Sequence, residues 1–186
     1  MSSRFVAVEL FRGHWKGLSD YRQKNPIADR WTRAILLVLP LLAGGAMFIP
    51  GAQLAAPGAI LAGVALLAGS FLAAWGQVAS LRLRLTERAA DFETAQQVDR
   101  DALDETAAHL LVASVLSGCT ALVLVLAMNL AANPATGAVS GPLAAIAVAL
   151  ATYVLLVFLI AVPRLYTAYV NIHKVRPELS GTHRGR

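Results

Sequence analysis

The side chains best placed to bind a divalent cation are four acids in the middle of the chain: Asp99, Asp101, Asp104 and Glu105. Clustered carboxylates are preferred ligands of hard cations, so one interpretation is a cation-dependent enzyme. The other interpretation is structural, because acids at the start of a helix accept hydrogen bonds from its free amide groups and complement its dipole. A turn of the chain near 96–101 would place Asp99 or Asp101 at a helix N-cap, which favours the structural interpretation.

The other candidate ligands are four histidines: His14, His109, His173 and His183. None has a second histidine three or four residues away, so local spacing does not indicate a zinc site. The sequence also contains no glycine-rich phosphate loop and no Ser/His/Asp arrangement typical of a nucleophilic enzyme. We therefore expect no catalytic residue, no bound metal and no cofactor, and a protein that is not an enzyme.

Charged residues are confined to three parts of the 186-residue chain. All 16 basic and 11 acidic side chains lie in residues 1–33, 82–105 and 164–186. Residues 34–81 and 106–163 contain none, and 57% of the whole chain is hydrophobic. A soluble domain of this size needs a charged surface, whereas long charge-free segments are typical of a membrane protein.

Each charge-free segment is too long for a single crossing, because about 20 apolar residues span a bilayer. Each also has a turn cluster near its middle, Ile-Pro-Gly-Ala-Gln at 49–53 and Asn-Pro-Ala-Thr-Gly at 133–137. Such clusters of Pro, Gly and Asn indicate turns. The sequence therefore predicts an all-α integral membrane protein with four transmembrane helices arranged as two hairpins. The predicted spans are residues 34–49, 59–81, 110–130 and 143–162.

Shorter segments outside the membrane flank these spans. Residues 1–24 carry apolar side chains three or four positions apart, which predicts a cytosolic amphipathic helix at the interface. An Asn-Pro pair then resembles a helix start and opens the membrane domain, residues 25–176. Within this domain, residues 82–105 are predicted to form a cytosolic helical loop. Residues 177–186 contain too few apolar side chains to become ordered.

Basic residues predict the orientation. Seven Lys and Arg precede residue 34, four lie in 82–105, five follow residue 163, and the two turns hold none. Because basic loops stay on the cytoplasmic side, we expect a multi-pass protein of the cell inner membrane with both termini in the cytosol. The isoelectric point of about 9.9 follows from these membrane-proximal bases, so we infer no nucleic-acid partner.

Aromatic residues near the N-terminus are predicted to lie at the membrane interface. Phe5, Phe11 and Trp15 share one face of the amphipathic helix, and neighbouring bases would meet the anionic lipid of the inner leaflet. Trp31 is placed as an interfacial anchor of the first span. The alternative is that the aromatic face packs on the protein's own cytosolic helices, and the pattern favours neither.

The second span carries a stripe of small residues. Ala65, Gly69 and Ala73 repeat every four positions and so lie on one face of a helix. Small side chains allow helix backbones to approach closely in lipid. We therefore expect this stripe to be a helix-contact face, and it favours a homo-oligomer.

Ionisable groups are nearly absent from the predicted spans, where Cys119 and Tyr153 are the exceptions. Proton-coupled carriers, ion pumps and intramembrane metal sites need such groups because they bind charge within the membrane. The sequence therefore argues against all three classes.

The stretch from Tyr21 to Phe92 resembles the SLATT group of two-span membrane effectors. The resemblance rests on a basic-aromatic helix, a tight hairpin and a continuing cytosolic helix, carried by residues 21–24, 29–31, Arg82, Arg84 and Arg88. Unlike those proteins, this chain adds a second hairpin, residues 106–163. The resemblance implies a membrane-disrupting effector of bacterial nucleotide-dependent conflict systems.

These observations together favour a non-enzymatic protein that works by association. It would either self-assemble into a pore-like oligomer or serve as the membrane subunit for a cytosolic partner, possible roles in bacterial defence. A channel or transporter for a neutral or weakly polar solute is the alternative, and a cation-dependent membrane enzyme ranks third. The surface expected to dock a cytosolic partner is the acidic set Asp91, Glu93, Asp99, Asp101, Asp104 and Glu105.

The charge pattern makes a direct prediction about topology. In a Cys119→Ala background, single cysteines at Gln53 and Thr136 should react with an impermeant thiol reagent added to intact cells. Cysteines at Ser3 and Ser180 should react only after the cells are opened. Labelling of either terminus from outside would refute the predicted orientation.

Overall fold

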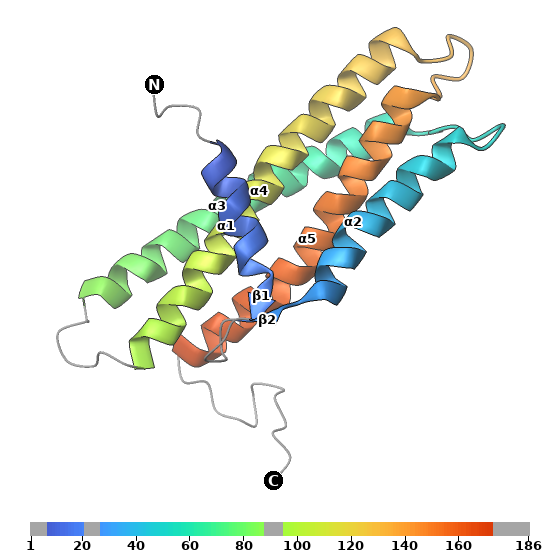
Figure 1. Cartoon of the computed structure of the whole chain (residues 1–186). Coiled ribbons are helices and arrows are strands. Elements are labelled where there is room, and N and C mark those ends of the chain that lie inside the picture. The colour runs from blue at the N-terminus through green and yellow to red at the C-terminus, as the bar shows by residue number, and fades with distance from the viewer. Residues whose placement is uncertain (1–6, 21–26, 88–94, 173–186) are drawn as a thin grey trace, which may run out of the picture.

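The computed structural model describes residues 7–20, 27–87 and 95–172. A short helix, α1 (Ala7–Gly17), is followed by four long ones, which are α2 (Arg30–Gly45), α3 (Pro57–Glu87), α4 (Ala95–Leu130) and α5 (Pro142–Ile172) (Figure 1). A 3-10 turn, η2 (Ala46–Phe48), extends α2, and the two-residue strands β1 (Ser19–Asp20) and β2 (Ile27–Ala28) pair antiparallel between α1 and α2.

All four long helices are long and apolar enough to cross a membrane. The predicted all-α membrane fold, with two hairpins along the chain and an N-terminal amphipathic helix, is confirmed. The apolar stretches are Arg30–Phe48, Pro57–Leu83, Leu103–Leu130 and Pro142–Thr167. We call the end of the helices that carries Arg33, Arg82 and Arg164 the charged end, and the opposite end the turn end.

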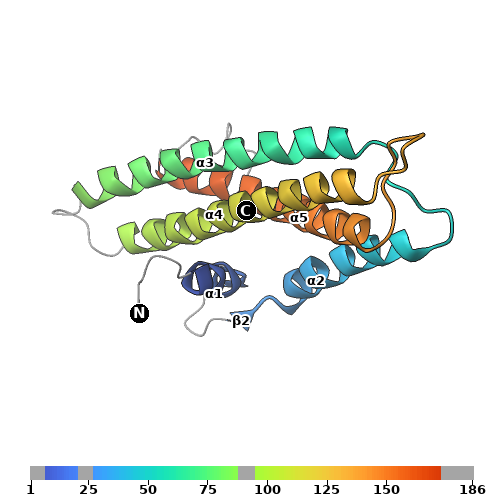
Figure 2. The same ribbon diagram turned by 90° about the horizontal axis from the view of Figure 1, so that it is seen from above.

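The long helices pack as an open row and not as a closed bundle (Figure 2). Helix α4 packs between α3 and α5, and α2 packs on α5. Although α2 and α3 are joined by a turn, the described residues of α2 have their extensive contacts with α5 and η2, not with α3. The chain buries 39% of the most apolar stretch of α4, but only 17% of that in α2 and 11% of that in α3.

Helices α3 and α4 pack through a seven-residue repeat. Val64, Phe71 and Val78 are buried at intervals of seven residues along α3. Such a repeat keeps one face of a helix against its neighbour, as in a coiled coil. Beyond this interface, the Phe71 ring reaches α5, where its centroid lies 6.0 Å from that of Phe158. The Phe71 and Phe158 side chains therefore connect α3 and α5 directly, although α4 packs between these two helices.

A close approach between backbones lies elsewhere, between α2 and α5. A Cβ atom on Gly44 would lie 2.8 Å from the Ala145 carbonyl oxygen and 3.0 Å from the Ala149 Cβ. No side chain larger than hydrogen fits there without movement of a neighbour. Small residues thus do allow a close helix contact in this chain, at Gly44.

The predicted contact stripe of α3 is not a contact face within the chain. Ala65, Gly69 and Ala73 are all exposed, and a Cβ atom on Gly69 would meet nothing within 4 Å. The face that α3 turns to α4 is instead made of larger side chains such as Phe71, which bury more area.

Two predicted helix starts are wrong. Helix α2 begins at Arg30, after the Asn-Pro pair, because Asp29 caps it by accepting hydrogen bonds from the Thr32 amide and hydroxyl groups. These hydrogen bonds hold the pKa of the Asp29 carboxyl group below its ordinary value. Helix α4 already begins at Ala95, so Asp99 and Asp101 lie inside it and do not cap it.

The remaining boundaries follow from these starts. Residues 82–87 continue α3 and residues 95–105 belong to α4, so the predicted cytosolic loop 82–105 is mostly the ends of two long helices. Helix α5 passes through Pro163 and extends beyond the predicted span 143–162 to Ile172. Phe5, Asp91, Glu93 and the predicted tail 177–186 lie outside the described residues.

The two predicted turns are joined at the turn end. The Leu54 amide donates to the Val139 carbonyl oxygen at 2.8 Å, and the Val139 amide donates to the Leu54 carbonyl oxygen at 3.0 Å. Val139 is buried, and its backbone also forms a bridge with Ala132. Gly51 adopts a φ of 85°, which glycine accepts without strain, and so completes the first turn. The loops of both hairpins are therefore held together.

The contact at Gly44 predicts a loss of stability on substitution. Gly44→Leu should lower the free energy of unfolding by about 1–3 kcal/mol, because the new side chain overlaps the α5 backbone. Unfolding in mixed micelles measures the change. Gly45→Leu is the matched control, because a Cβ atom on Gly45 meets nothing within 4 Å. Equal effects of the two substitutions would contradict the close α2–α5 contact.

Candidate functional site

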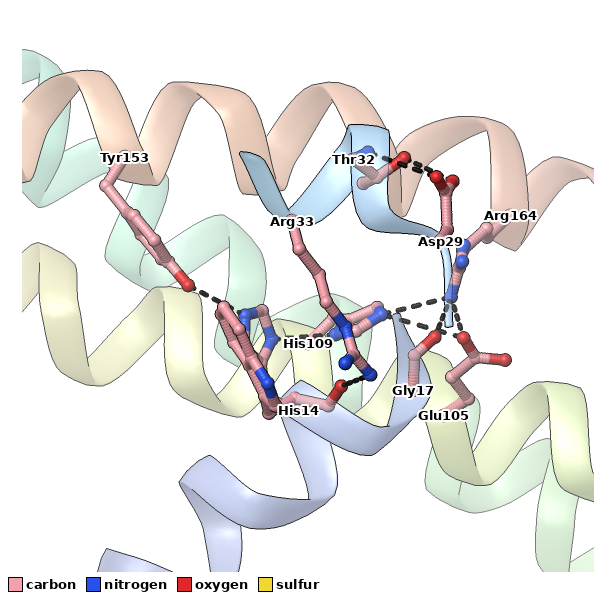
Figure 3. Close-up of polar contacts among 10 residues, drawn as sticks. His14, Gly17, Asp29, Thr32, Arg33, Glu105, His109, Tyr153 and Arg164 are labelled. Atoms are coloured by element: carbon pink, nitrogen blue, oxygen red, sulfur yellow. Dashed lines mark hydrogen bonds and ion pairs between the residues drawn. The ribbon is translucent and has the colours of Figure 1, made fainter. Parts of the chain in front are cut away.

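Polar side chains from three helices meet near the charged end (Figure 3). We call this cluster the polar junction; its members are His14 of α1, Glu105 and His109 of α4, and Tyr153 and Arg164 of α5. Helix α1 lies across the long helices and is seen almost end-on in Figure 2, where α3 and α4 are seen from the side. The junction thus fixes a crossing helix to the membrane-spanning row.

Two glycines of α1 face α4, and the second of them, Gly17, allows a close approach. A Cβ atom on Gly13 would lie 3.7 Å from the Ala108 Cβ, an ordinary contact. A Cβ atom on Gly17 would lie only 2.6 Å from the Glu105 Cγ and 3.2 Å from the His109 Cε1. Four residues apart, the glycines share the face of α1 that also carries His14, and Leu18 completes the contact with 1% of its surface exposed.

The hydrogen bonds of the junction assign a tautomer to each histidine. Arg164 Nη1 lies 3.0 Å from His109 Nε2, and because an arginine only donates, we assign His109 Nε2 as the acceptor. The proton of a neutral His109 is therefore on Nδ1, which donates to His14 Nδ1 at 2.7 Å. His14 in turn carries its proton on Nε2 and donates to the Tyr153 hydroxyl oxygen at 3.0 Å. Both imidazoles are neutral in this arrangement.

Both histidines are buried, and burial disfavours the charged form of an imidazole. His14 is 2% exposed and His109 is not exposed. Burial lowers the pKa of His14 from 6.5 to about 3, and the positive charge that a protonated His109 would carry and the charge of Arg164 act in the same direction. Arg164 is compensated by an ion pair with Glu105, and it also donates to the Gly17 carbonyl oxygen at 2.8 Å. One arginine thus ties the end of α1 to both α4 and α5.

A second contact joins α1 to α2. Arg33 Nη2 donates to the Trp15 carbonyl oxygen at 2.9 Å, and the Arg33 guanidinium carbon lies 5.2 Å from the centroid of the Trp15 ring. Cation–π geometry of this kind adds to the hydrogen bond. Helix α1 therefore contacts α2, α4 and α5 at once.

The structure places the predicted interface residues on the outer side of α1 and at the start of α2. Phe11, Trp15 and Trp31 all remain exposed within the chain. The inner face, with His14 and Leu18, packs on the protein's own helices. The two alternatives for this amphipathic segment therefore apply to different faces: one packs on α4, and the aromatic face is left open.

The predicted acidic surface is divided. Asp104 is exposed and pairs with Arg82 of α3 at 3.0 Å, whereas Glu105 turns inward to the junction. Asp99 and Asp101 lie one or two turns earlier in α4. Among the residues described, no three His, Cys, Asp or Glu side chains gather as a metal site would require.

Sequence reasoning missed the junction because its two histidines are 95 residues apart. Local spacing tests only neighbours on one helix. The usable signals were the Gly13–Gly17 pair flanking His14, and Glu105 placed four residues before His109. Neither signal identifies a partner helix by itself.

Comparison with protein-family models, curated proteins and solved structures found no match for this chain. The resemblance to the SLATT group therefore stays a prediction. Arguments about function rest on the polar junction and on the open row of helices.

The role of Arg164 can be tested by stability. Arg164→Met should lower the free energy of unfolding by about 2 kcal/mol, because the half-buried Glu105 carboxylate and the Gly17 carbonyl each lose a donor. Arg82→Met is the control, since its ion pair with Asp104 is more exposed and should contribute about 1 kcal/mol or less. Chemical unfolding in mixed micelles measures both. A larger loss for Arg82→Met would contradict the ranking.

Proposed function

We propose that this chain is a non-enzymatic protein of the inner membrane that acts by association, as a homo-oligomer that presents a cytosolic surface to a partner. The observation that carries the proposal is the open row of helices. Its outer members, α2 and α3, leave most of their apolar stretches uncovered by the chain itself. A second copy covers such a face in the membrane without any new polar chemistry.

The exposed face of α3 supports lateral association. Ala65, Gly69 and Ala73 lie on it, and space is open around Gly69. Since lipid is as apolar as a leucine side chain, helices associate in membranes mainly where small residues permit close packing. The stripe that finds no partner within the chain is thus suited to a neighbouring copy.

The lengths of the helices support a surface outside the membrane. Helix α3 has 31 residues and α4 has 36, which at the α-helical rise correspond to about 46 and 54 Å. The hydrocarbon core of a bilayer is only about 30 Å thick. The excess lies at the charged end, because the turn end closes directly after the apolar stretches.

The distribution of basic residues favours a cytosolic location for this surface. Lys and Arg are concentrated in the termini and in the 82–105 segment, and the turns contain none. Asp91, Glu93, Asp99, Asp101 and Asp104 belong to the same segment and would meet the cytosolic partner. The resemblance to SLATT effectors supports a pore-like effector or sensor in bacterial defence.

A channel or transporter for a neutral or weakly polar solute is the alternative. In an open row, a path enclosed by protein would have to form between copies, because α2 and α3 do not close the row into a ring. Both functions therefore depend first on the oligomer, and flux into liposomes separates them.

The oligomer is tested with a pair of substitutions on the exposed face of α3. Gly69→Leu should shift the mass measured in detergent toward the monomer, at a cost on the order of 1–2 kcal/mol per contact, because bulk there separates the copies. Leu72→Ala, at another exposed position of α3, should leave the mass unchanged. Light scattering with chemical crosslinking gives the readout. A wild-type protein that is monomeric in lipid nanodiscs would refute the proposal.

A further inference from the structure

In this arrangement the polar junction has no acceptor for an additional proton on His14 Nδ1. His14 Nδ1 and His109 Nδ1 are 2.7 Å apart, and this contact exists only while one of the two atoms lacks a proton. A proton on His14 Nδ1 turns the contact into two opposed donors. A proton on His109 Nε2 instead faces the donating Arg164 Nη1 at 3.0 Å.

The surrounding charges do not relieve this conflict. From α4, Glu105 lies 3.8 Å from His109 Nε2, but it already forms the ion pair with Arg164 of α5. The Tyr153 hydroxyl of α5 accepts from His14 without offering a charge. On the other elements, α2 contributes Arg33 near the Trp15 carbonyl and Asp29, which is engaged by Thr32. On α1 itself, Glu9, Arg12 and Lys16 are exposed.

We propose that His14 and His109 form an acid-sensitive latch: neutral imidazoles hold α1 across α4 and α5, and proton uptake releases α1 from the long helices. Release exposes the face of α1 that carries Gly13, His14 and Gly17, and it uncovers α4 around Ala108. It also breaks the Trp15–Arg33 contact, which links α1 to α2, an outer member of the row. The latch rests on the proposed function in one respect only, since that places α1 in the cytosol and makes cytosolic pH the signal.

The direction and range of the response follow from linkage. The pKa of His14 is about 3 when α1 is docked and 6.5 for an ordinary histidine. The released state therefore binds more protons, and docking is fully stable above pH 6.5 and weakens as the pH falls below it. For His14 alone, the ratio of released to docked molecules rises about tenfold per pH unit below 6.5.

The latch can be tested by distance measurements between spin labels. In a Cys119→Ala background, labels are attached at Val8→Cys on α1 and Leu83→Cys on α3, both at exposed positions. The full-length protein is placed in lipid nanodiscs and frozen at pH values from 8.0 to 4.5. Labelled protein is diluted with an excess of unlabelled protein, so that distances within one copy dominate. A narrow distance is expected at pH 7.5, and a broad, longer component is expected to grow from pH 6.5 downward. A distance that stays unchanged to pH 4.5 would overturn the proposal.

Two sets of variants identify the titrating groups. The His14→Gln/His109→Gln pair keeps hydrogen-bonding capacity but cannot gain a proton in this range, so the distance should no longer depend on pH. Release that persists with the same midpoint would assign it to carboxylates and overturn the latch. Glu105→Gln leaves both histidines but removes the charge that compensates Arg164, so its release midpoint should move to higher pH. An unchanged midpoint in Glu105→Gln also counts against the latch, even if the double variant fails to dock.

The mass of each sample is recorded along with the distances. A monomeric protein with a pH-dependent distance would contradict the proposed homo-oligomer and leave the latch in place. An oligomer with a pH-independent distance would contradict the latch and leave the proposed homo-oligomer in place.

Discussion

The hydrocarbon interior of a bilayer supplies no hydrogen-bond partners and excludes charge, and this constraint shapes every part of the chain. It gathers the charged residues at one end of the long helices. It also favours local acceptors for polar side chains within the spans: Ser117, Thr120 and Thr152 donate to carbonyl oxygens four residues earlier on their own helices. Ser114 is different, because its hydroxyl donates across to the Ala68 carbonyl oxygen of α3.

The polar junction obeys the same constraint at its boundary. Arginine cannot lose its charge, so Arg164 needs Glu105 beside it, and its donated hydrogen bonds orient the neighbouring groups. The imidazole of His109 presents a lone pair to Arg164, so its proton is on Nδ1 and is donated to His14. His14 then carries its own proton on Nε2 and donates it to Tyr153. A single fixed cation thus determines the protonation of two buried histidines. The crossing helix is stable only while that order is kept.

The spans, their turns and their number were readable from the sequence because hydropathy is a property of the chain taken one segment at a time. Packing partners were not readable, because a side chain that faces lipid and one that faces another apolar helix obey the same preference. Gly44 and Gly69 illustrate this: both are glycines inside apolar helices, yet one touches the α5 backbone and the other faces outward. The helix start at Asp29 was missed in favour of an Asn-Pro pair, although Asp29 is itself a good N-cap residue.

The junction was unreadable for a different reason. His14 and His109 come from opposite sides of the first hairpin, and nothing in their local surroundings states that α1 folds back onto α4. Sequence did place Phe11 and Trp15 on one face of an amphipathic helix. It did not identify the packed face, where Gly17 permits the close approach to α4. The glycines beside His14 indicate a close helix contact, but the sequence does not say which helix makes that contact.

The hydrogen bonds between Leu54 and Val139 have a mechanical consequence for the whole row. They tether the loops of the two hairpins to each other, so α2 with α3, and α4 with α5, share a common pivot at that end. The tether restricts relative displacements of the helices near the turn end, so larger displacements are confined to the charged end. Helix α1 lies across the row on the side where displacements are largest. Its contacts with α2 and α5 limit how far these helices can separate there.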